Sequence, residues 1–224
     1  MNIKTKFNEE LLIGLERQPT KKAVLLFSGG IDSTAAGILL KEKGYRVFPL
    51  FIDYGQSSLA AEQLVVNKIA IKLGFEPVRV ITTELLKQLT KSNLLGKEAV
   101  DDSQAWVPGR NTLFMIIAGI FAKQVDADGV CIGYMLDDNF VFGDNDYFHH
   151  KNVEQLLSKS FLQPMEVFMP IVSYRKKDLV TLLMEKGLLS DTVSCWNAKV
   201  VRGKVVSCGS CANCLERNSL LVVK

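Results

Sequence analysis

The sequence predicts an α/β fold with a doubly wound, mainly parallel sheet and a small cysteine-rich module at its C-terminal end. Short apolar runs alternate with helical segments from residue 22 to residue 187, the pattern of parallel strands joined by crossover helices. A glycine-rich turn, Ser28–Thr34, follows the first apolar run, and four of the five cysteines lie after residue 194. Together these features predict a layered domain with an anion-binding loop.

Size and composition set the broad class. The chain has 224 residues, of which 48% are hydrophobic and 23% charged, and a net charge of +3. This is the mix of a soluble globular protein, and the small net charge favours neither direct nucleic-acid binding nor a membrane surface. We expect a helical extension over residues 1–20, an α/β domain over 21–190 and a metal-binding module over 191–224. The extension lacks the apolar core of a secretory signal, so we expect a cytoplasmic protein. Its apolar helical face comprises Phe7, Leu11, Leu12 and Leu15.

The first strands and helices follow from apolar runs and glycine stops. The run Lys22–Phe27 (KAVLLF) is typical of a buried parallel strand. A helix is expected over Thr34–Lys43, a second strand over Val47–Ile52 and a second helix over Leu59–Leu73. Each helix is followed by a glycine, which favours its end there. Pro49 lies inside the second strand and predicts an edge position or a bulge.

The middle of the chain continues the alternation. We expect a third strand over Val78–Ile81 and a short helix over Thr83–Leu89, with the threonine as its cap. No period is visible over Lys91–Trp106, which predicts a loop or lid. The segment Thr112–Val125 is apolar almost all round, as in a buried helix. The run Gly129–Gly133 (GVCIG) predicts a fourth strand.

The last part of the α/β region is less regular. Residues 134–150 are polar and aromatic without a period, so we expect a loop that contains the solvated pair His149–His150. A helix is expected over Val153–Ser160 and a short strand over Glu166–Met169. Ser173 should cap a helix that runs to Lys186. In open parallel sheets ligands bind at the carboxyl ends of the strands, so the loops after strands one to four should share one crevice.

The sharpest chemical signal is the turn after the first strand, Ser28-Gly29-Gly30-Ile31-Asp32-Ser33-Thr34. Adjacent glycines let the backbone N–H groups approach an anion, the hydroxyls add donors, and the next helix directs its positive end to the same point. The pattern is neither Walker A nor the dinucleotide fingerprint. A structural turn capped by Asp32 is the plainer alternative. The hydroxyl density and the flanking strand and helix favour phosphate binding.

SGGIDS resembles the SGGxDS loop of the PP-loop ATP pyrophosphatases, which split ATP between its α and β phosphates. The resemblance implies the adenine nucleotide alpha hydrolase-like form of the fold, release of AMP and pyrophosphate, and Mg²⁺ placed by Asp32. It also implies that Ser28 and Ser33 take part in catalysis. The residues of this turn that it implies bind ATP are Phe27, Ser28, Gly29, Gly30, Ile31, Asp32, Ser33 and Thr34.

Four further segments resemble one family of that superfamily, the 7-cyano-7-deazaguanine synthases. They are Phe51-Ile52-Asp53-Tyr54-Gly55-Gln56, Val107-Pro108-Gly109-Arg110-Asn111, Thr192-Val193-Ser194-Cys195-Trp196 and the ending Cys208–Arg217. The resemblance covers nearly the whole chain. It implies a homodimeric ligase of queuosine biosynthesis that adenylates 7-carboxy-7-deazaguanine, adds ammonia to form the amide, and dehydrates the amide to the nitrile with a second ATP.

The same resemblance assigns ligand roles. It implies that Phe51, Tyr54, Gln56, Arg110 and Asn111 bind ATP, and that Tyr54 and Gln56 also reach the substrate. Arg110 is a natural phosphate clamp because its guanidinium is planar and permanently charged. A surface cation at a helix start is the alternative, which the helix dipole disfavours.

Cys195, Cys208, Cys211 and Cys214 have the spacing C-x12-C-x2-C-x2-C. Four thiolates suit one tetrahedral Zn²⁺ in a closed structural site, and an iron–sulfur cluster is the main competitor. The first gap is longer than the family's usual one, and its residues AKVVRGKVV predict a hairpin that turns at Arg202-Gly203. Cys131 lies in an apolar strand, where we expect it to pack.

The sequence departs from the family after the fourth strand. Where the family has D-[FY]-S-G-Y-P-D-C-R, the Ser, Pro, Cys and Arg are absent, and only Asp138 and Asp144 match. We expect Asp138, Phe140 and Asp144 to contact a deazaguanine, through carboxylate oxygens and a stacking ring. The departure leaves a second reading open, in which the activated carboxylate is joined to another amine, such as one on a protein. A tRNA-modifying enzyme and a non-enzymatic nucleotide-binding protein are the remaining alternatives.

Overall fold

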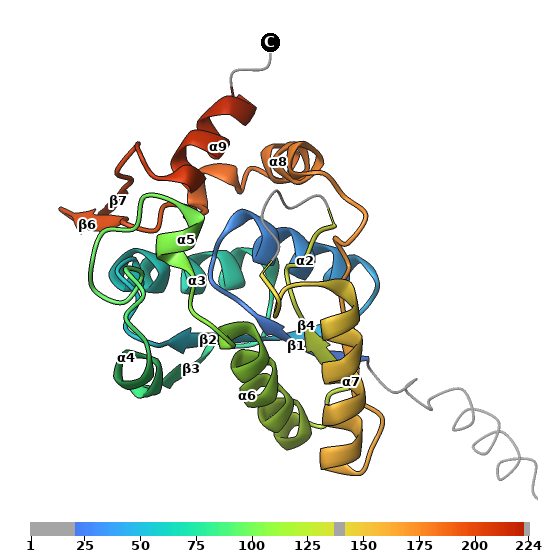
Figure 1. Ribbon diagram of the computed structural model, residues 1–224. Coiled ribbons are helices and arrows are strands. Elements are labelled where there is room, and N and C mark those ends of the chain that lie inside the picture. Colours follow the sequence, from blue (N-terminus) through green and yellow to red (C-terminus); the bar gives the residue numbers. More distant parts are fainter. Residues whose placement is uncertain (1–20, 137–141, 222–224) are drawn as a thin grey trace, which may run out of the picture.

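The protein forms a five-stranded parallel sheet with helices on both faces (Figure 1), so the predicted fold class is confirmed. The computed structural model describes residues 21–136 and 142–221. The expected N-terminal helix and the candidate residues Asp138 and Phe140 lie outside these ranges. The strand order is β3-β2-β1-β4-β5. The strands are β1 (Lys22–Leu26), β2 (Arg46–Asp53), β3 (Arg79–Thr82), β4 (Gly129–Cys131) and β5 (Glu166–Phe168).

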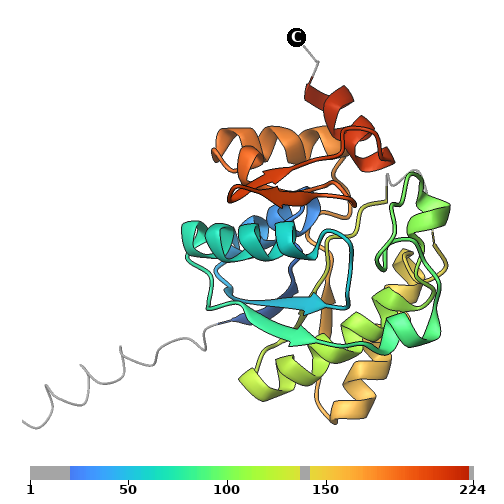
Figure 2. The same ribbon diagram turned by 90° about the vertical axis from the view of Figure 1, so that its left-hand side faces the viewer.

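Helices cover the sheet in two layers. One face carries α2 (Ile31–Glu42) and α3 (Leu59–Leu73), with α8 (Lys176–Glu185) packed on α2, while the other face carries α6 (Arg110–Val125) and α7 (Tyr147–Phe161) (Figure 2). The remaining elements are α4 (Leu85–Leu89), α5 (Asp102–Ala105), the 3₁₀ turn η1 (Leu189–Asp191), the hairpin strands β6 (Lys199–Val201) and β7 (Lys204–Val206), and α9 (Ala212–Leu221).

The two cores follow from the alternation of side chains along each strand. In β1, Ala23 and Leu25 face the α2–α3 layer and Val24 faces the α6–α7 layer, and all three are fully buried. The chain winds outward from β1 to β2 and β3, then returns to the other side of β1 as β4 and β5. The order therefore reverses between β1 and β4, where a crevice opens at the carboxyl ends of the strands.

Pro49 does not mark an edge, because β2 pairs with β1 on one side and with β3 on the other. The Val47 carbonyl accepts from the Glu76 N–H on the β3 side, whereas the Leu50 carbonyl accepts from Phe27 on the β1 side. The N–H and carbonyl groups of successive residues point alternately toward the two neighbouring strands. The backbone of Pro49 therefore points toward β3, as that of Val47 does. Pairing with β3 starts only at Leu50, so the missing N–H removes no ladder bond.

Five helix starts differ from expectation. The helix α4 begins at Leu85 with Glu84, not Thr83, as its N-cap, and α6 begins at Arg110, two residues before the expected Thr112. The helix α2 begins at Ile31, three residues before the expected Thr34, because Gly30 provides its extended N-cap. The helix α7 begins at Tyr147, since the Asp146 carboxylate accepts from the His149 N–H and caps it. The cap of α8 is Arg175 and not Ser173, because Arg175 and Asp178 bond reciprocally across the first turn. Helix α6 is also less buried than expected, since Ile120 is 57% exposed.

The segment 91–106, expected to be a loop or lid, is tied to the C-terminal part of the chain and contains α5. The Asn197 amide donates to the Ala99 carbonyl at 2.8 Å and accepts from the Ala99 N–H at 3.0 Å. The Val100 carbonyl accepts from the Ala212 N–H at 2.9 Å. The segment is therefore a fixed wall. None of the helices in the described ranges has the length and apolar character needed to cross a bilayer.

The buried carboxylate Asp191 ties η1 to α3, and its removal should lower stability. It is 8% exposed and accepts hydrogen bonds from Lys68, at 2.6 Å, and from Lys72. Burial favours the neutral acid, but the two lysine hydrogen bonds outweigh it and lower the pKa of Asp191. Asp191→Asn should reduce the free energy of unfolding by about 1–3 kcal/mol at pH 7, measured by urea denaturation.

The pH dependence gives the control for this prediction. A depressed carboxyl pKa stabilises the fold above the ordinary aspartate pKa and loses that contribution as pH falls through the folded value. The difference in free energy of unfolding between the wild type and Asp191→Asn should therefore shrink below about pH 4. Glu98→Gln, which breaks an exposed pair with Lys199 at 3.9 Å, should leave the midpoint unchanged. A constant difference across the pH range would contradict the ion-pair account.

Candidate nucleotide site and cysteine cluster

A cavity of about 410 Å³ lies at the carboxyl ends of β1, β2 and β4. It brings together most of the residues that the sequence assigned to a nucleotide. Those that line it are Phe27, Ser28, Gly30, Ile31, Asp32, Ser33, Phe51, Tyr54, Gln56, Arg110 and Asn111. Of the loops expected to share one crevice, those after β1, β2 and β4 converge, whereas Thr83 and Glu84, directly after β3, do not line the cavity.

The loop between β1 and α2 leaves backbone donors open. Gly29 has a φ of +74°, and a Cβ there would lie 2.6 Å from the Val65 side chain, so only glycine fits. No side chain caps the N-terminus of α2 within the described part of the chain. The Ser28 and Ser33 hydroxyl oxygens lie 3.3 Å apart at the same point. Uncapped N–H groups, a helix dipole and two hydroxyls form a receptor for a phosphate-like anion.

Asp32, in the first turn of α2, combines one paired oxygen with one unpaired oxygen. Its Oδ2 accepts from the Lys176 ammonium at 2.8 Å, and Lys176 also lies 3.7 Å from Glu216. Its Oδ1 is buried and has no hydrogen-bond partner among the described residues. Buried polar atoms are normally paired, so this oxygen fits a ligand such as a divalent cation held together with phosphates.

Arg110 is a cavity residue and not a surface cation. It is the first residue of α6, and its guanidinium lies 5.9 Å from the centre of the Tyr54 ring. Its Nη1 donates to the Tyr54 hydroxyl at 3.4 Å. Burial raises the pKa of Tyr54, while the positive charge of Arg110 opposes the rise. The pair places a permanent positive charge and an aromatic face on the β2 side of the loop between β1 and α2.

Gln56 holds the loop after β2 through its own amide. The amide donates to the Glu62 carboxylate at 2.8 Å and to the Ile52 carbonyl at 3.3 Å, and its oxygen accepts from the Tyr54 N–H at 3.0 Å. Burial raises the pKa of Glu62, whereas hydrogen bonds from Ser58 and Gln56 lower it. Gln56 therefore orients Tyr54, and Glu62 is a cavity carboxylate that the sequence did not single out.

Three expected ligand residues lie off the cavity. Gly29 and Thr34 do not line it, and Thr34 is fully buried. Asp144 is also outside its lining, since its carboxylate accepts from the Asn111 N–H at 3.0 Å and so stabilises the start of α6. Among the described residues, the loop after β4 contributes Phe142 and Asn145 to the lining instead.

The C-terminal segment supplies a wall of the cavity that the sequence analysis did not foresee. Trp196, Asn213, Glu216 and Arg217 line it together with Lys176 from α8. Arg217 donates to the Thr192 hydroxyl at 2.9 Å and to the Leu189 carbonyl at 2.5 Å. The position of Arg217 in the C-x-x-R ending is a sequence signal from which its place in the site could have been predicted. Lys176 offered none, because it lies 144 residues from its partner Asp32.

The histidine pair is not a solvated loop, and the expectation is wrong for a local reason. Both residues lie in the first turns of α7. His150 is 1% exposed and lines the cavity. The His149 Nε2 lies 2.9 Å from the Thr112 hydroxyl of α6. Within the part of the chain that the structure describes, the His149 ring therefore has a hydrogen-bond partner and the His150 ring has none.

The four C-terminal cysteines form one cluster in which all sulfur atoms lie within 4.8 Å of one another. Two of the pairs, Cys208–Cys214 and Cys195–Cys211, are 4.0 Å apart. A tetrahedral ion with bonds of about 2.3 Å needs sulfurs about 3.8 Å apart. An iron–sulfur cluster separates its thiolates further, because several irons and sulfides lie between them. The donor set therefore fits a single metal ion.

Hydrogen-bond donors beside the cluster favour the thiolate form of Cys208. The Cys208 Sγ accepts from the Cys211 N–H at 3.4 Å. Burial works against the charged form, but the Ser210 and Cys211 donors outweigh it and lower the pKa of Cys208 to about 5.

The β6–β7 hairpin turns at Arg202 and Gly203, both with positive φ, as predicted. Cys131 is fully buried in β4, and burial raises the pKa of its thiol, so its expected packing role is confirmed.

Comparison with known proteins gives a consistent result. The family described as "Queuosine biosynthesis protein QueC" matches residues 22–222. A 7-cyano-7-deazaguanine synthase of Methanocaldococcus jannaschii is 29% identical over 217 residues, which cover 88% of this chain and 92% of the relative. The enzymes of the same name from Methanothrix thermoacetophila and Campylobacter hominis are 29% and 30% identical, with the same two coverages. The matched region includes the whole sheet, the cavity and the cysteine cluster.

Proposed function

The chain belongs to the family of queuosine biosynthesis protein QueC, and on that premise we propose that it converts 7-carboxy-7-deazaguanine to 7-cyano-7-deazaguanine with ATP. The observation that carries the proposal is one cavity that joins an uncapped glycine loop to the unpaired Asp32 oxygen and the Arg110 guanidinium. A polyphosphate with a bound cation matches all three features.

The proposed chemistry activates the same carbon twice. A carboxylate oxygen attacks the α-phosphorus of ATP, the bond to the β-phosphate oxygen breaks, and pyrophosphate leaves. Ammonia attacks the acyl carbon and expels AMP to give the amide, with loss of a proton. The amide oxygen then attacks the α-phosphorus of a second ATP and pyrophosphate leaves, after which expulsion of AMP with loss of both N–H protons of the amide gives the nitrile. The two adenylation steps need charge stabilisation at phosphorus more than acid–base chemistry.

The described residues divide these tasks by position. The N–H groups of Gly30 and Ile31 and the hydroxyls of Ser28 and Ser33 would hold the departing pyrophosphate. Lys176 adds a positive charge beside Asp32. Arg110 would bind the α-phosphate from the β2 side, where Phe51 and Tyr54 offer apolar and aromatic surface to the nucleoside. Mg²⁺, held through Asp32 and the phosphates, would supply charge neutralisation.

The cysteine cluster would hold one structural Zn²⁺. All four ligands are thiolates, so no coordination position is left for substrate. The metal would fix the segment that brings Trp196 and Arg217 to the cavity wall. The role proposed for zinc is therefore to shape the site, with no part in bond making.

Arg110→Ala should reduce kcat/KM for ATP at least tenfold, or by ~1.4 kcal/mol of transition-state binding. The reason is loss of the positive charge that the cavity places against Tyr54. Steady-state pyrophosphate release measures the effect. Arg79→Ala is the matched control, because Arg79 stacks on Phe121 at 5.5 Å outside this cavity. Equal kinetics for the two variants would count against the phosphate role.

The nucleotide products test the reaction class. Incubation with ATP, Mg²⁺, ammonia and 7-carboxy-7-deazaguanine should yield AMP and pyrophosphate, with two AMP formed for each nitrile. Ion-exchange chromatography separates these products from ADP and phosphate. ADP and phosphate as the main products would reject cleavage between the α and β phosphates, and with it the proposed function.

A further inference from the structure

The ring of His150 is a buried part of the cavity wall. It is 1% exposed and lines the cavity, yet neither Nδ1 nor Nε2 has a partner among the described residues. Buried polar atoms in native proteins are nearly always paired, because an unpaired one costs free energy. An unpaired ring at the wall of a ligand cavity indicates that the ligand supplies the missing partner.

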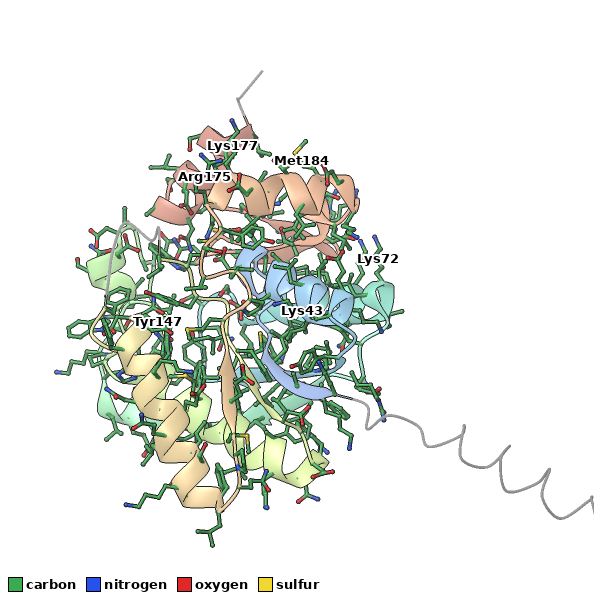
Figure 3. The ribbon with its side chains drawn as sticks, turned by 90° about the vertical axis from the view of Figure 1, so that its right-hand side faces the viewer. Lys43, Lys72, Tyr147, Arg175, Lys177 and Met184 are labelled. Atoms are coloured by element: carbon green, nitrogen blue, oxygen red, sulfur yellow. The ribbon has the colours of Figure 1, made fainter. Side chains whose placement is uncertain are left out.

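The protein fixes the His150 ring in place. Its backbone N–H donates to the Asp146 carbonyl in the capped first turn of α7. Its ring meets the Tyr134 ring edge-on, with centroids 4.8 Å apart. In Figure 3, Tyr147 marks the upper end of α7, where this helix begins. A ring held by a helix start and an aromatic neighbour is preorganised for one partner geometry.

The His150 ring and the expected nucleoside contacts, Phe51 and Tyr54, lie on opposite sides of the loop between β1 and α2. The segment after β4 packs directly on that loop, since a Cβ at Gly133 would lie 3.0 Å from the Ser33 N–H nitrogen. Tyr134 follows Gly133 and contacts His150. Phe51 and Tyr54 belong to β2 and its loop, on the other side of β1. A group that attacks the α-phosphate must enter from the side that the nucleoside leaves free.

We propose that His150 recognises the heterocycle of the deazaguanine substrate through hydrogen bonds from its uncharged imidazole ring. An uncharged imidazole offers one N–H donor and one acceptor nitrogen. A deazaguanine offers both complements, with N–H donors and a carbonyl oxygen on its edges. The proposal rests on the proposed function and names a specificity residue that lies outside the motifs shared with the family.

The surroundings keep the ring uncharged. Burial lowers the pKa of His150 to about 4, and the neighbouring His149 acts in the same direction. Asp146 and Asp144 act in the opposite direction and do not overcome it. An uncharged ring would make no ion pair with the substrate carboxylate, so it would leave that group free to attack ATP. His150 thus suits recognition of the ring system and not of the reacting group.

The test measures the binding of two ligands to variants of the adjacent residues His150 and His149. His150→Phe keeps an aromatic ring and removes both nitrogens, while His150→Gln keeps a donor and an acceptor. His149→Gln is the matched control, since His149 neighbours the same helix turn but bonds Thr112. Isothermal titration measures binding of 7-carboxy-7-deazaguanine and, separately, of a non-hydrolysable ATP analogue to each protein.

For His150→Phe we expect deazaguanine affinity to fall at least tenfold and ATP-analogue affinity to stay within twofold. His150→Gln should recover part of the loss, and His149→Gln should bind both ligands as the wild type does. A melting temperature equal to or above the wild type would show that His150→Phe folds. Wild-type deazaguanine affinity in His150→Phe would overturn the role of His150 alone. Failure of the wild-type protein to bind deazaguanine would overturn the proposed function as well.

Discussion

Replacing Asp32 with alanine should abolish pyrophosphate release, a loss of at least about 10²–10³-fold, while the protein stays folded. In the loop between β1 and α2, the Asp32 carboxylate has one oxygen bonded to Lys176 and one that is buried without a partner in the described ranges. On the proposed function, the substitution would remove a ligand of the cation that accompanies ATP and one of the two carboxylates that contact Lys176. Single-turnover pyrophosphate release and a thermal melt measure the two halves of this expectation.

Glu42→Ala provides the control for that experiment. The Glu42–Lys186 pair joins the far ends of α2 and α8 at 2.8 Å, just as the Asp32–Lys176 pair joins their starts. Both substitutions remove one lysine–carboxylate bond between the same two helices, but only one lies at the cavity. Glu42→Ala should keep wild-type turnover. Similar turnover in both variants would show that Asp32 serves helix packing and not ATP chemistry.

Replacing Cys211 with serine should release the metal and destabilise the protein on the order of 4 kcal/mol, because metal binding in a closed site contributes folding free energy. For a chain of this size that corresponds to a fall in melting temperature of roughly 8–16 °C. The residue is 1% exposed, and its sulfur lies 4.0 Å from that of Cys195. Elemental analysis and a thermal melt of the purified variant measure both effects.

Cys131→Ala separates metal binding from cysteine packing. Cys131 is fully buried in β4 and is not one of the four clustered cysteines. This variant should retain one Zn²⁺ per chain, and any destabilisation should come from lost packing alone. Iron in the wild-type protein, or no bound metal, would contradict the zinc assignment. Unchanged metal content in Cys211→Ser would contradict the ligand set.

Local signals in the sequence were sufficient where one residue type decides the backbone. The helix Leu59–Leu73 has its predicted bounds because Gly74 adopts the left-handed conformation that ends it. The hairpin after Cys195 was predictable because Gly203 readily adopts the positive φ of a tight two-residue turn and lies between two valine-rich runs. The glycine loop could be placed at the cavity because it follows a buried strand directly.

Contacts between distant segments were not predictable in this way. Lys176 reaches Asp32 across 144 residues, and Asp144 caps the start of α6 across 33 residues. Neither contact has a periodic or motif signature in the sequence. The start of α7 was missed because Tyr147, Phe148 and the two histidines are moderate helix formers. The Asp146 cap and the packing of His150 against Tyr134 fix that turn.

The most direct test of the account is the identity of the organic product. The wild-type protein is incubated with 7-carboxy-7-deazaguanine, ATP, Mg²⁺ and ammonia, and the mixture is separated and analysed by mass spectrometry. The account predicts 7-cyano-7-deazaguanine, with the amide as an intermediate at early times and two AMP for each nitrile. Recovery of unchanged 7-carboxy-7-deazaguanine with ATP intact, from protein that carries its metal and is folded, would contradict it.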